Sequence, residues 1–556
     1  MKKIGITLDS LYCNTILYDT IRDLANNNNI DLFFIIKKNE PTQNVLLSSM
    51  NLGISPNSII KSIEYFFFNL LIKIEAFIFF IFSKEIKEYN ITSNVYEFTD
   101  NEIVYLNPNK LNDELIVHNS IKSLDLDLIV LTNNSGYSTN DKINLSKDGT
   151  IFITFGKNCN YLRCPPAFWE VYLQDPSTLF TIEHKKRGNS KTHALFRGEI
   201  PTKVYYIKNF VSIEKNSYPH IVRIIIKYAI TNNFLIAPSH SYVERKLSIP
   251  TFAQSFCYFI RFLVSQILSL IKNCFLYKHE IWHVAYSNTN WQNMTAHKRT
   301  KITPPRNHFY ADPFLVEKAA QTICFLEDYN FNSGKACITA VEIIDDKNYK
   351  ILGPVINEPF HMSFPFTFEY QNELYMVPET TEKKSIRLYK CVDFPLEWKY
   401  EGDLMNYISA ADSIIFYFQG KWWLLFSTNI AGNDDHDSIL MAYSNDNPLT
   451  NNWKEHELNP LICDSKIGRN GGLLEINAEA PIRVRQRHGY NFYGEGVTFA
   501  KIIDLTPNTF SEEEIKIINP KSLKWMIKGI HHMHSNKKYT VFDYTYRDRA
   551  FKKKLR

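Results

Sequence analysis

The stretch ADPFLVEKAAQTICFLEDY, residues 311–329, shows the pattern on which the fold of this chain rests. A small and an acidic residue precede an apolar run, a polar turn and a second apolar run, as in a β-hairpin. Four later stretches repeat the pattern: FPFTFEYQNELYMVPET from Phe364, ADSIIFYFQGKWWLLFST from Ala411, GGLLEINAEAPIRVRQ from Gly471 and GIHHMHSNKKYTVFDY from Gly529. Their starts lie 53, 47, 60 and 58 residues apart, which leaves room for two more strands after each hairpin.

Five such units predict an all-β five-bladed β-propeller over residues 283–550. A four-stranded antiparallel blade repeated around a central axis is the plan of this fold, and a regular repeat is its signature in sequence. The alternative is a β-sandwich whose hairpins are similar by accident.

The ends of the hairpins predict a polar mouth. The start of the first strand of an antiparallel hairpin lies beside the end of the second, so in the inner strands of blades these positions open on one face around the axis. The units place there Asp312, Glu327, Asp328, Glu379, Asp412, Gln486, His531 and Asp543, with Arg306 and His308 just before the first unit. Because so many ionisable groups are costly to bury without partners, we expect a wet pocket.

Asp312, Glu379 and Asp412 are the candidate catalytic residues. Cleavage of a glycosidic bond needs a carboxylic acid that protonates the leaving oxygen and a second carboxylate, about 5–9.5 Å away, that acts as base or nucleophile. Three carboxylates from neighbouring blades supply this pair and a group that tunes the pKa of the acid. The alternative is that each aspartate caps a turn through backbone hydrogen bonds.

Residues 1–225 have the pattern of an α/β domain. Strands are expected at KKIGITLD, DLFFIIKK, DLDLIVLT (125–132) and IFITF (151–155), with a helix over residues 15–24. Strands that alternate with helical segments favour a mostly parallel sheet. An apolar helical linker is expected over residues 226–282.

Two apolar stretches, residues 62–84 and 252–277, raise the question of a membrane. Lys73 and Glu75 interrupt the first, and Arg261 lies within the second. A spanning helix needs about 20 mostly apolar residues with few or no charges. We therefore predict two amphipathic helices that pack on protein or lie on a membrane surface.

Composition and motifs exclude several classes of function. A net charge of +5, without a dense basic stripe, argues against a nucleic-acid partner. The nine cysteines lack the spacing of a disulfide framework, and MKKIGITLDS lacks the apolar core of a signal peptide. A cytoplasmic protein is therefore expected, either free or bound peripherally to a membrane. No dinucleotide loop, phosphate loop or HExxH motif occurs, so no cofactor is expected. In the run HHMH successive histidines face opposite sides of a strand, so no metal site is predicted.

The motifs HFYADPFLVE, EPFHMSFPFTFEYQNELYMVPET, RLYKCVDFPLEW and ADSIIFYFQGKWWLLF resemble the N-terminal propeller domain of glucosamine inositolphosphorylceramide transferases. They are also similar, more distantly, to five-bladed glycosidases of the arabinanase and fructosidase type. The resemblance covers residues 280–545 and continues in Arg483, Gln486, Gly529 and His531. It implies sugar chemistry or sugar recognition. In the plant enzymes glycosyl transfer is attributed to a separate C-terminal domain, which is not expected here.

The N-terminal half is similar to the formyltransferase-like domains that are fused to such propellers in bacteria. The similarity rests on CPPAFWEVYLQDPSTLFTIEH, residues 164–184, and on ALFRGEIP from Ala194. Active formyltransferases use an Asn, a His just before this region and a downstream Asp to assist attack of an amine on a formylated folate. Here FITFGKNCNYLRC has no histidine and RGNSKTH has no acid. We therefore expect a degenerate domain that does not transfer formyl groups.

Together these patterns predict a carbohydrate-binding or carbohydrate-processing protein of surface-glycan or glycolipid assembly, whose ligand is a glycan or an activated sugar. The residues expected to bind substrate are Arg306, His308, Arg483, Gln486, His531 and Asp543. Two alternatives stay open. One is a non-catalytic glycan-recognition scaffold, and the other is a formyl- or acyltransferase that acts on an amino sugar through the N-terminal domain.

Overall fold

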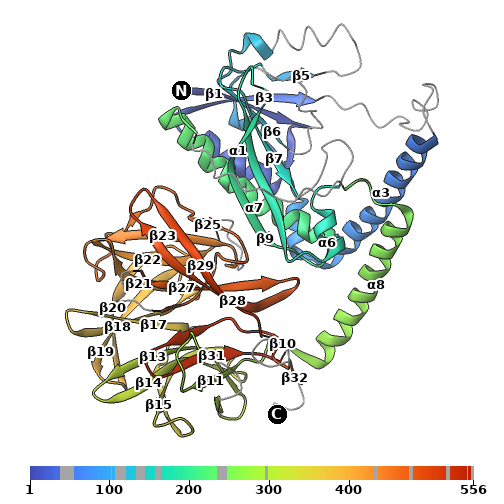
Figure 1. The fold of residues 1–556 in the computed structure, drawn as a ribbon. Helices are drawn as coiled ribbons and strands as arrows, with labels where there is room; N and C mark the ends of the chain where they lie inside the picture. The colour runs from blue at the N-terminus through green and yellow to red at the C-terminus, as the bar shows by residue number, and fades with distance from the viewer. Residues whose placement is uncertain are drawn as a thin grey trace. The chain divides into compact units, whose positions relative to one another are not determined.

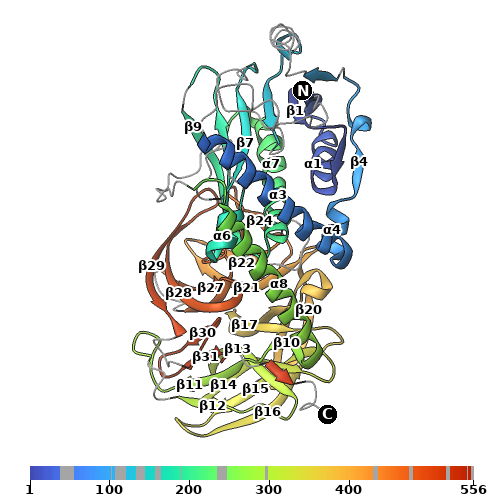
Figure 2. The same ribbon diagram turned by 90° about the vertical axis from the view of Figure 1, so that its right-hand side faces the viewer.

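The computed structural model describes residues 1–37, 56–101, 103–106, 121–132, 145–156, 165–189, 191–234, 247–294, 299–429, 436–474, 480–520, 526–546 and 549–551 (Figure 1, Figure 2). The chain separates into two compact units, Met1–Gln266 and Ile267–Arg556.

The first unit contains a mixed sheet of seven strands among its described residues, in the order β5-β3-β1-β6-β7-β8-β9. The strands are β1 (Lys2–Leu8), β3 (Ile30–Lys37), β5 (Val104–Leu106), β6 (Leu128–Leu131), β7 (Thr150–Phe155), β8 (Ser177–Lys185) and β9 (Thr192–Pro201). Neighbours from β5 to β7 pair in parallel, and β8 and β9 add antiparallel pairs. A short pair, β2 (Tyr12–Asn14) and β4 (Thr92–Asn94), lies outside this sheet. The mostly parallel sheet expected from the sequence is confirmed.

Helices cover this sheet and extend from it. They are α1 (Thr15–Ala25), α3 (Pro56–Phe82), α4 (Lys84–Tyr89), α6 (Phe168–Leu173), α7 (Tyr206–Thr231) and α8 (Phe252–Phe275), with the 3-10 turn η1 (Tyr96–Phe98). The side chain of Asn14 caps α1 by accepting a hydrogen bond from the backbone N–H of Leu17. Within the described residues, Ile60–Phe82 and Phe252–Ile271 are long and apolar enough, by length and composition alone, to cross a membrane.

The similarity of the first unit to formyltransferases stays a prediction. The segment in which those enzymes carry their histidine includes residues 157–164, which lie outside the described residues. The fold as described shows a mixed parallel sheet and no more specific relationship.

The second unit is a five-bladed β-propeller, as the sequence predicted. Four blades follow one another along the chain: β13 (His308–Lys318), β14 (Gln321–Asn330), β15 (Lys335–Ile343) and β16 (Tyr349–Ile356); β17 (Ser363–Tyr370), β18 (Glu373–Glu379), β19 (Ser385–Asp393) and β20 (Glu397–Asn406); β21 (Ala410–Phe418), β22 (Lys421–Thr428), β23 (Ile439–Asn445) and β24 (Lys454–Glu455), with β25 (Ile462–Cys463) beside β23; β26 (Asn470–Leu474), β27 (Ile482–Gly489), β28 (Phe492–Leu505) and β29 (Phe510–Ile518). The 3-10 turn η4 (Thr381–Lys383) follows β18.

The fifth blade closes the ring with strands from both ends of the unit. Its order is β12-β11-β31-β30, formed by β11 (His283–Ser287), β12 (Thr300–Ile302), β30 (Met533–Ser535) and β31 (Thr540–Tyr544). Beside it, β10 (Leu276–Glu280) pairs with β32 (Arg549–Phe551). Each blade packs apolar side chains on its neighbours, so the core of this unit lies between blades.

Candidate functional site

Four blades begin with the same backbone irregularity. The register of the inner hairpin shifts between Ala311 and Phe314 in the first of them, and at the matching place in the other three. The shifted residues with positive φ are Asp312 (49°), Phe364 (46°), Asp412 (52°) and Gly472 (126°). Bulges of this kind bend a strand and redirect a side chain. The position that repeats in the sequence therefore lies in a β-bulge, and in two of the blades it also carries an acidic side chain.

One cavity of about 460 Å³ lies at the blade starts. Its lining combines carboxylates, cationic or titratable groups and aromatic rings: Glu280, Trp282, Phe309, Ala311, Asp312, Glu327, His361, Ser363, Glu379, Arg469, Tyr493 and His531. Asp312 and Glu379, two of the three candidate catalytic residues, are among them. Asp412, the third, is not.

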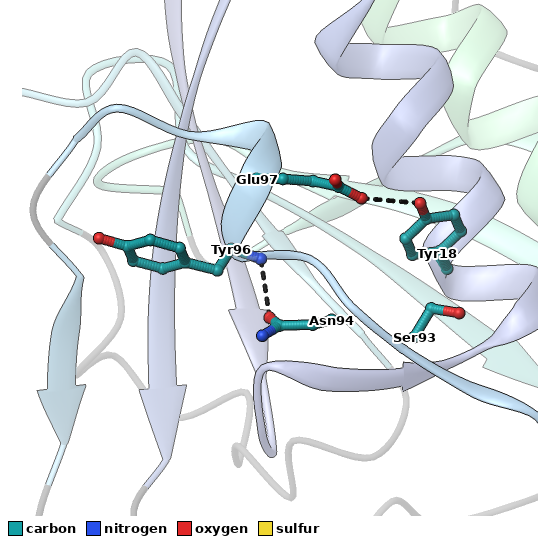
Figure 3. A pocket seen from close by; sticks show the side chains of 5 residues that line it. All are labelled: Tyr18, Ser93, Asn94, Tyr96 and Glu97. Atoms are coloured by element: carbon teal, nitrogen blue, oxygen red, sulfur yellow. Dashed lines mark hydrogen bonds between the residues drawn. The ribbon is translucent and has the colours of Figure 1, made fainter.

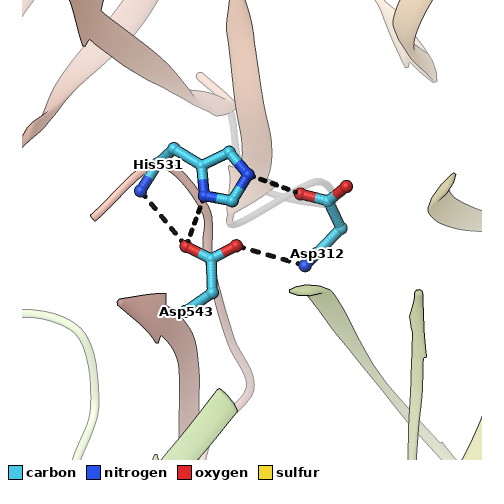
Figure 4. A group of neighbouring side chains, drawn as sticks. All are labelled: Asp312, His531 and Asp543. Atoms are coloured by element: carbon cyan, nitrogen blue, oxygen red, sulfur yellow. Dashed lines mark hydrogen bonds and ion pairs between the residues drawn. The ribbon is translucent and has the colours of Figure 1, made fainter. Parts of the chain in front are cut away.

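His531 lies between two aspartates (Figure 4). Its Nδ1 lies 2.8 Å from a carboxylate oxygen of Asp543, and its Nε2 lies 3.4 Å from one of Asp312. Asp543 also accepts backbone hydrogen bonds from Asp312, His531 and His532. Burial lowers the pKa of His531, but the carboxylates of Asp543 and Asp312 outweigh it and raise the pKa overall. Burial raises the pKa of Asp312 to about 8, against the effect of His531.

The same three side chains could hold a metal ion. One ligand atom from each of Asp312, His531 and Asp543 lies within 4.8 Å of the others. Oxygen and imidazole nitrogen atoms suit several divalent ions. A protonated imidazole between two carboxyl groups accounts for the same arrangement without an ion.

Arg469 contacts three carboxylates. Its Nε donates to Asp412 at 2.6 Å and its Nη1 to Asp437 at 3.1 Å, while its Nη2 lies 3.9 Å from Glu379. Its guanidinium lies over the ring of Tyr493, 5.1 Å from the centroid. Asp412 also accepts a hydrogen bond from the amide of Gln486 at 2.9 Å. Asp412 therefore positions Arg469 and does not line the cavity.

Glu327 and Glu379 hold equivalent positions near the ends of the second strands, β14 and β18, of two neighbouring blades. Ala311 pairs with Glu327, and Ser363 pairs with Glu379. Burial raises the pKa of Glu327 well above its usual range, and the nearby Asp312 and Glu379 carboxylates raise it further. His361 lies 3.5 Å from Glu327.

The other predicted binding residues lie outside the cavity lining. Arg306 is exposed before β13, and His308 pairs with Asp328 at 2.5 Å. Arg483 is fully buried and pairs with Glu512 through two hydrogen bonds of 2.9 Å. Asp543 is fully buried beneath His531. Of the six substrate-binding candidates, His531 alone is part of the lining described.

Four residues of the lining were not predicted from the sequence: Arg469, Tyr493, Trp282 and His361. Glu327 was predicted to lie at the mouth but was not named as a catalytic or substrate-binding candidate. Arg469 directly precedes Asn470, the first residue of β26, and so lies just before the fourth repeat, which starts at Gly471. Trp282 directly precedes β11 and lies outside the five repeats. Its ring lies 3.9 Å from that of His531, centroid to centroid.

A second hollow lies in the first unit and is lined by exposed and half-buried polar side chains (Figure 3). It measures about 390 Å³ and is bordered by Tyr18, Ser93, Asn94, Tyr96 and Glu97. Its carboxylate, Glu97, accepts a hydrogen bond of 2.8 Å from the Tyr18 hydroxyl. The propeller cavity, with several carboxylates and a half-buried arginine, is the better candidate for a functional site.

Comparison with curated proteins finds similarity to plant transferases. Glucosamine inositolphosphorylceramide transferase 1 of Oryza sativa subsp. japonica is 33% identical over 214 residues, which is 38% of this chain and 28% of the relative. The protein of the same name from Arabidopsis thaliana is 33% identical over 226 residues, which is 40% of this chain and 29% of the relative. The chain thus spans less than a third of the length of these relatives.

Solved structures with similar folds include glycoside hydrolases. A family 117 glycoside hydrolase of Zobellia galactanivorans has a TM-score of 0.32 and 11% identity, covering 48% of this chain and 91% of that one. The catalytic domain of a GH62 α-L-arabinofuranosidase of Coprinopsis cinerea has a TM-score of 0.33 and 9% identity, covering 48% and 97%.

The same part of the chain matches a family of known domains. Residues 277–541, which contain four blades and most of the fifth, match the family described as "Glucosamine inositolphosphorylceramide transferase 1, N-terminal". The resemblance predicted from the motifs of the propeller is confirmed.

Proposed function

We propose that the propeller binds a sugar unit of a glycan or glycolipid in the cavity at its mouth. The observation that carries this proposal is the composition of the lining. Carboxylates and an arginine surround a space of about 460 Å³, and Trp282, Phe309 and Tyr493 supply aromatic surface. A cavity of this size fits a small ligand.

The two kinds of side chain match the two kinds of surface on a sugar. Carboxylates accept hydrogen bonds from hydroxyl groups, and such charge-assisted bonds are stronger than neutral ones. Aromatic rings bring large apolar area to the C–H faces of the sugar ring. The plant relatives are named as transferases of a glycolipid, which favours the same class of ligand.

A catalytic form of the proposal rests on two carboxyl groups that line the cavity, Asp312 and Glu379. Burial raises the pKa of Asp312 to about 8, which leaves a proton to donate at neutral pH. Glu379 lines the same cavity and faces the cation of Arg469 at 3.9 Å. We assign Asp312 the role of acid and Glu379 that of base or nucleophile, with Asp412 as a positioning residue for Arg469.

Binding is tested by calorimetry of the full chain with a panel of glucosamine, N-acetylglucosamine, arabinose, fructose and inositol. We expect Glu379→Gln to weaken binding of the recognised sugar about tenfold or more, because a charged hydrogen bond contributes about 1.5–3 kcal/mol. Glu369→Gln is the matched control, since Glu369 is exposed on the same blade. Equal affinity in the two variants would contradict the proposal.

A turnover assay distinguishes an enzyme from a non-catalytic recognition scaffold. Nitrophenyl glycosides of the sugar that binds are incubated with the chain and with Asp312→Asn. Release of nitrophenol that Asp312→Asn abolishes supports catalysis in the cavity. Binding without release favours the non-catalytic scaffold.

A further inference from the structure

The outer faces of helices α3 and α8 are apolar. On α3 the exposed apolar side chains are Ile60, Ile63, Phe66, Leu70, Ile74, Phe77, Phe80, Ile81 and Phe82, and on the first part of α8 they are Phe252, Phe256, Ile260, Leu263 and Val264. A surface helix of a soluble protein normally turns polar residues outward. Contiguous exposed apolar area of this extent marks an interaction surface.

The inner faces of the same helices are already occupied. Phe68 of α3 and Tyr258 of α8 pack in one buried cluster with Phe168 and Tyr206, and Phe79 packs with Phe262 in a second. The rings of Phe67 and Phe252 lie 5.4 Å apart, centroid to centroid, so the helices lie side by side, as Figure 2 shows.

A buried carboxylate fixes this arrangement. Glu75, in the middle of α3, accepts hydrogen bonds from the Tyr258 hydroxyl at 2.7 Å and the backbone N–H of Ile207 at 3.0 Å. Helices that crossed a bilayer would have to leave these partners and carry Glu75 into hydrocarbon, which is costly. The inner faces therefore stay on the protein, and the outer faces alone are available.

We propose that α3 and α8 lie on a lipid bilayer, with their outer faces in the boundary between headgroups and acyl chains. The described apolar stretches, Ile60–Phe82 and Phe252–Ile271, have 23 and 20 residues, which corresponds to about 35 and 30 Å of helix at 1.5 Å per residue. Long helices that are apolar on one face and carry basic side chains bind membranes in this way.

Charge favours lipid over a protein partner. Among the exposed residues of 60–82 and 252–266, the charged ones are Lys61, Lys73 and Arg261, all cationic. Basic side chains beside an apolar face complement anionic headgroups. A protein interface would instead be expected to carry a polar rim around its apolar core. This inference is independent of the sugar site.

Vesicle flotation tests the proposal. The full chain is purified in mild detergent and mixed, during detergent removal, with phosphatidylcholine vesicles with or without phosphatidylglycerol. We expect flotation with the anionic vesicles, and weaker flotation at high salt because exposed charges are screened. Phe66→Glu combined with Ile260→Glu should reduce the bound fraction about tenfold.

Two variants sharpen the test. Ile230→Glu, on the exposed surface of α7, is a control with the same change in polarity and should float like the native chain. Lys73→Glu should weaken flotation with anionic vesicles and leave flotation with neutral vesicles unchanged. Circular dichroism in detergent checks that the outward substitutions leave the fold intact.

Three results would overturn the proposal. In the first, the chain stays in the lipid-free fraction as a dimer that the Phe66→Glu and Ile260→Glu changes dissociate, so a second copy covers the face. In the second, Ile230→Glu lowers flotation as much as the pair does. In the third, extraction at alkaline pH leaves the chain fully in the vesicles, so the helices span the bilayer.

Discussion

At the scale of single residues, one repeated backbone position serves different purposes in successive blades. Asp312 faces the cavity, while Asp412 is bound to Arg469 and Gln486. In the blade between them the position holds Phe364, which packs against Phe314. The bulge supplies the geometry in each case, and the neighbouring blade decides whether the side chain meets a cavity, an ion pair or a core.

In the fourth blade the same register shift contains Gly472, one residue after this position. A Cβ added there would lie 2.5 Å from the carbonyl oxygen of Met533, and φ is 126°. We expect Gly472→Ala to lower the free energy of unfolding of the propeller by about 2–4 kcal/mol, measured by denaturant titration.

Gly420→Ala is the matched control for this prediction. Gly420 also has positive φ, 83°, but an added Cβ would meet nothing within 4 Å. Its cost should stay near 1 kcal/mol, the backbone effect alone. Equal losses for the two variants would show that the approach of Met533 contributes nothing.

At the scale of elements, the propeller depends on pairing between strands from its two ends. β11 pairs in register with β31 from His283↔Tyr544 to Ser287↔Thr540. The contact also buries apolar side chains, since Val284 and Tyr286 pack in one cluster with Tyr539 and Val541. A propeller without this closure would expose the edge strands of two blades, which is unfavourable.

Deleting residues 529–556 should therefore abolish the cooperative unfolding of the propeller. The deletion removes both β30 and β31, so β11 keeps β12 as its partner on one side and loses its partner on the other. Calorimetry of the full chain and of the shortened chain measures this. A chain that ends after Phe551 serves as control and should unfold like the native one. A preserved propeller transition in the longer deletion would contradict the role given to closure.

At the scale of the whole molecule, the chain consists of two units with separate cores. We expect two unfolding transitions, and a buried glutamate makes the first unit sensitive to pH. Glu214 in α7 is 1% exposed and accepts a hydrogen bond from Tyr89. Burial raises its pKa from 4.5 to about 7, against the effect of Tyr89.

The sign of the pH effect follows from this shift. Between pH 4.5 and about 7 the folded unit keeps a proton that the unfolded chain releases, so stability falls as pH rises through this window. The loss amounts to about 3 kcal/mol, since one unit of pKa corresponds to about 1.4 kcal/mol. Glu214→Gln should remove this contribution from the first unit's transition in melts at pH 5 and pH 8, and leave the propeller's transition unchanged. The contribution of Glu75, whose pKa burial also raises to about 7, should remain. Glu85→Gln, on the exposed surface of α4, should change neither.

The amino-acid sequence alone determined the propeller, the mostly parallel sheet and the presence of carboxylates at the blade starts. These depend on local patterns: alternation within a hairpin, turn residues and the spacing of repeats. The pairing of Glu379 with the start of its blade follows from the hairpin itself, which is why it was predictable.

Only the tertiary structure decided which of these carboxylates line the same cavity. It also decided which apolar side chains of α3 and α8 stay exposed. Asp412 and Arg469 are 57 residues apart and come from different blades, so no local pattern links them. The same holds for Glu75 of α3, which Tyr258 binds from 183 residues away. Side-chain partners of this kind are set by packing between elements, and a pattern along the chain carries no information about which neighbour will lie against it.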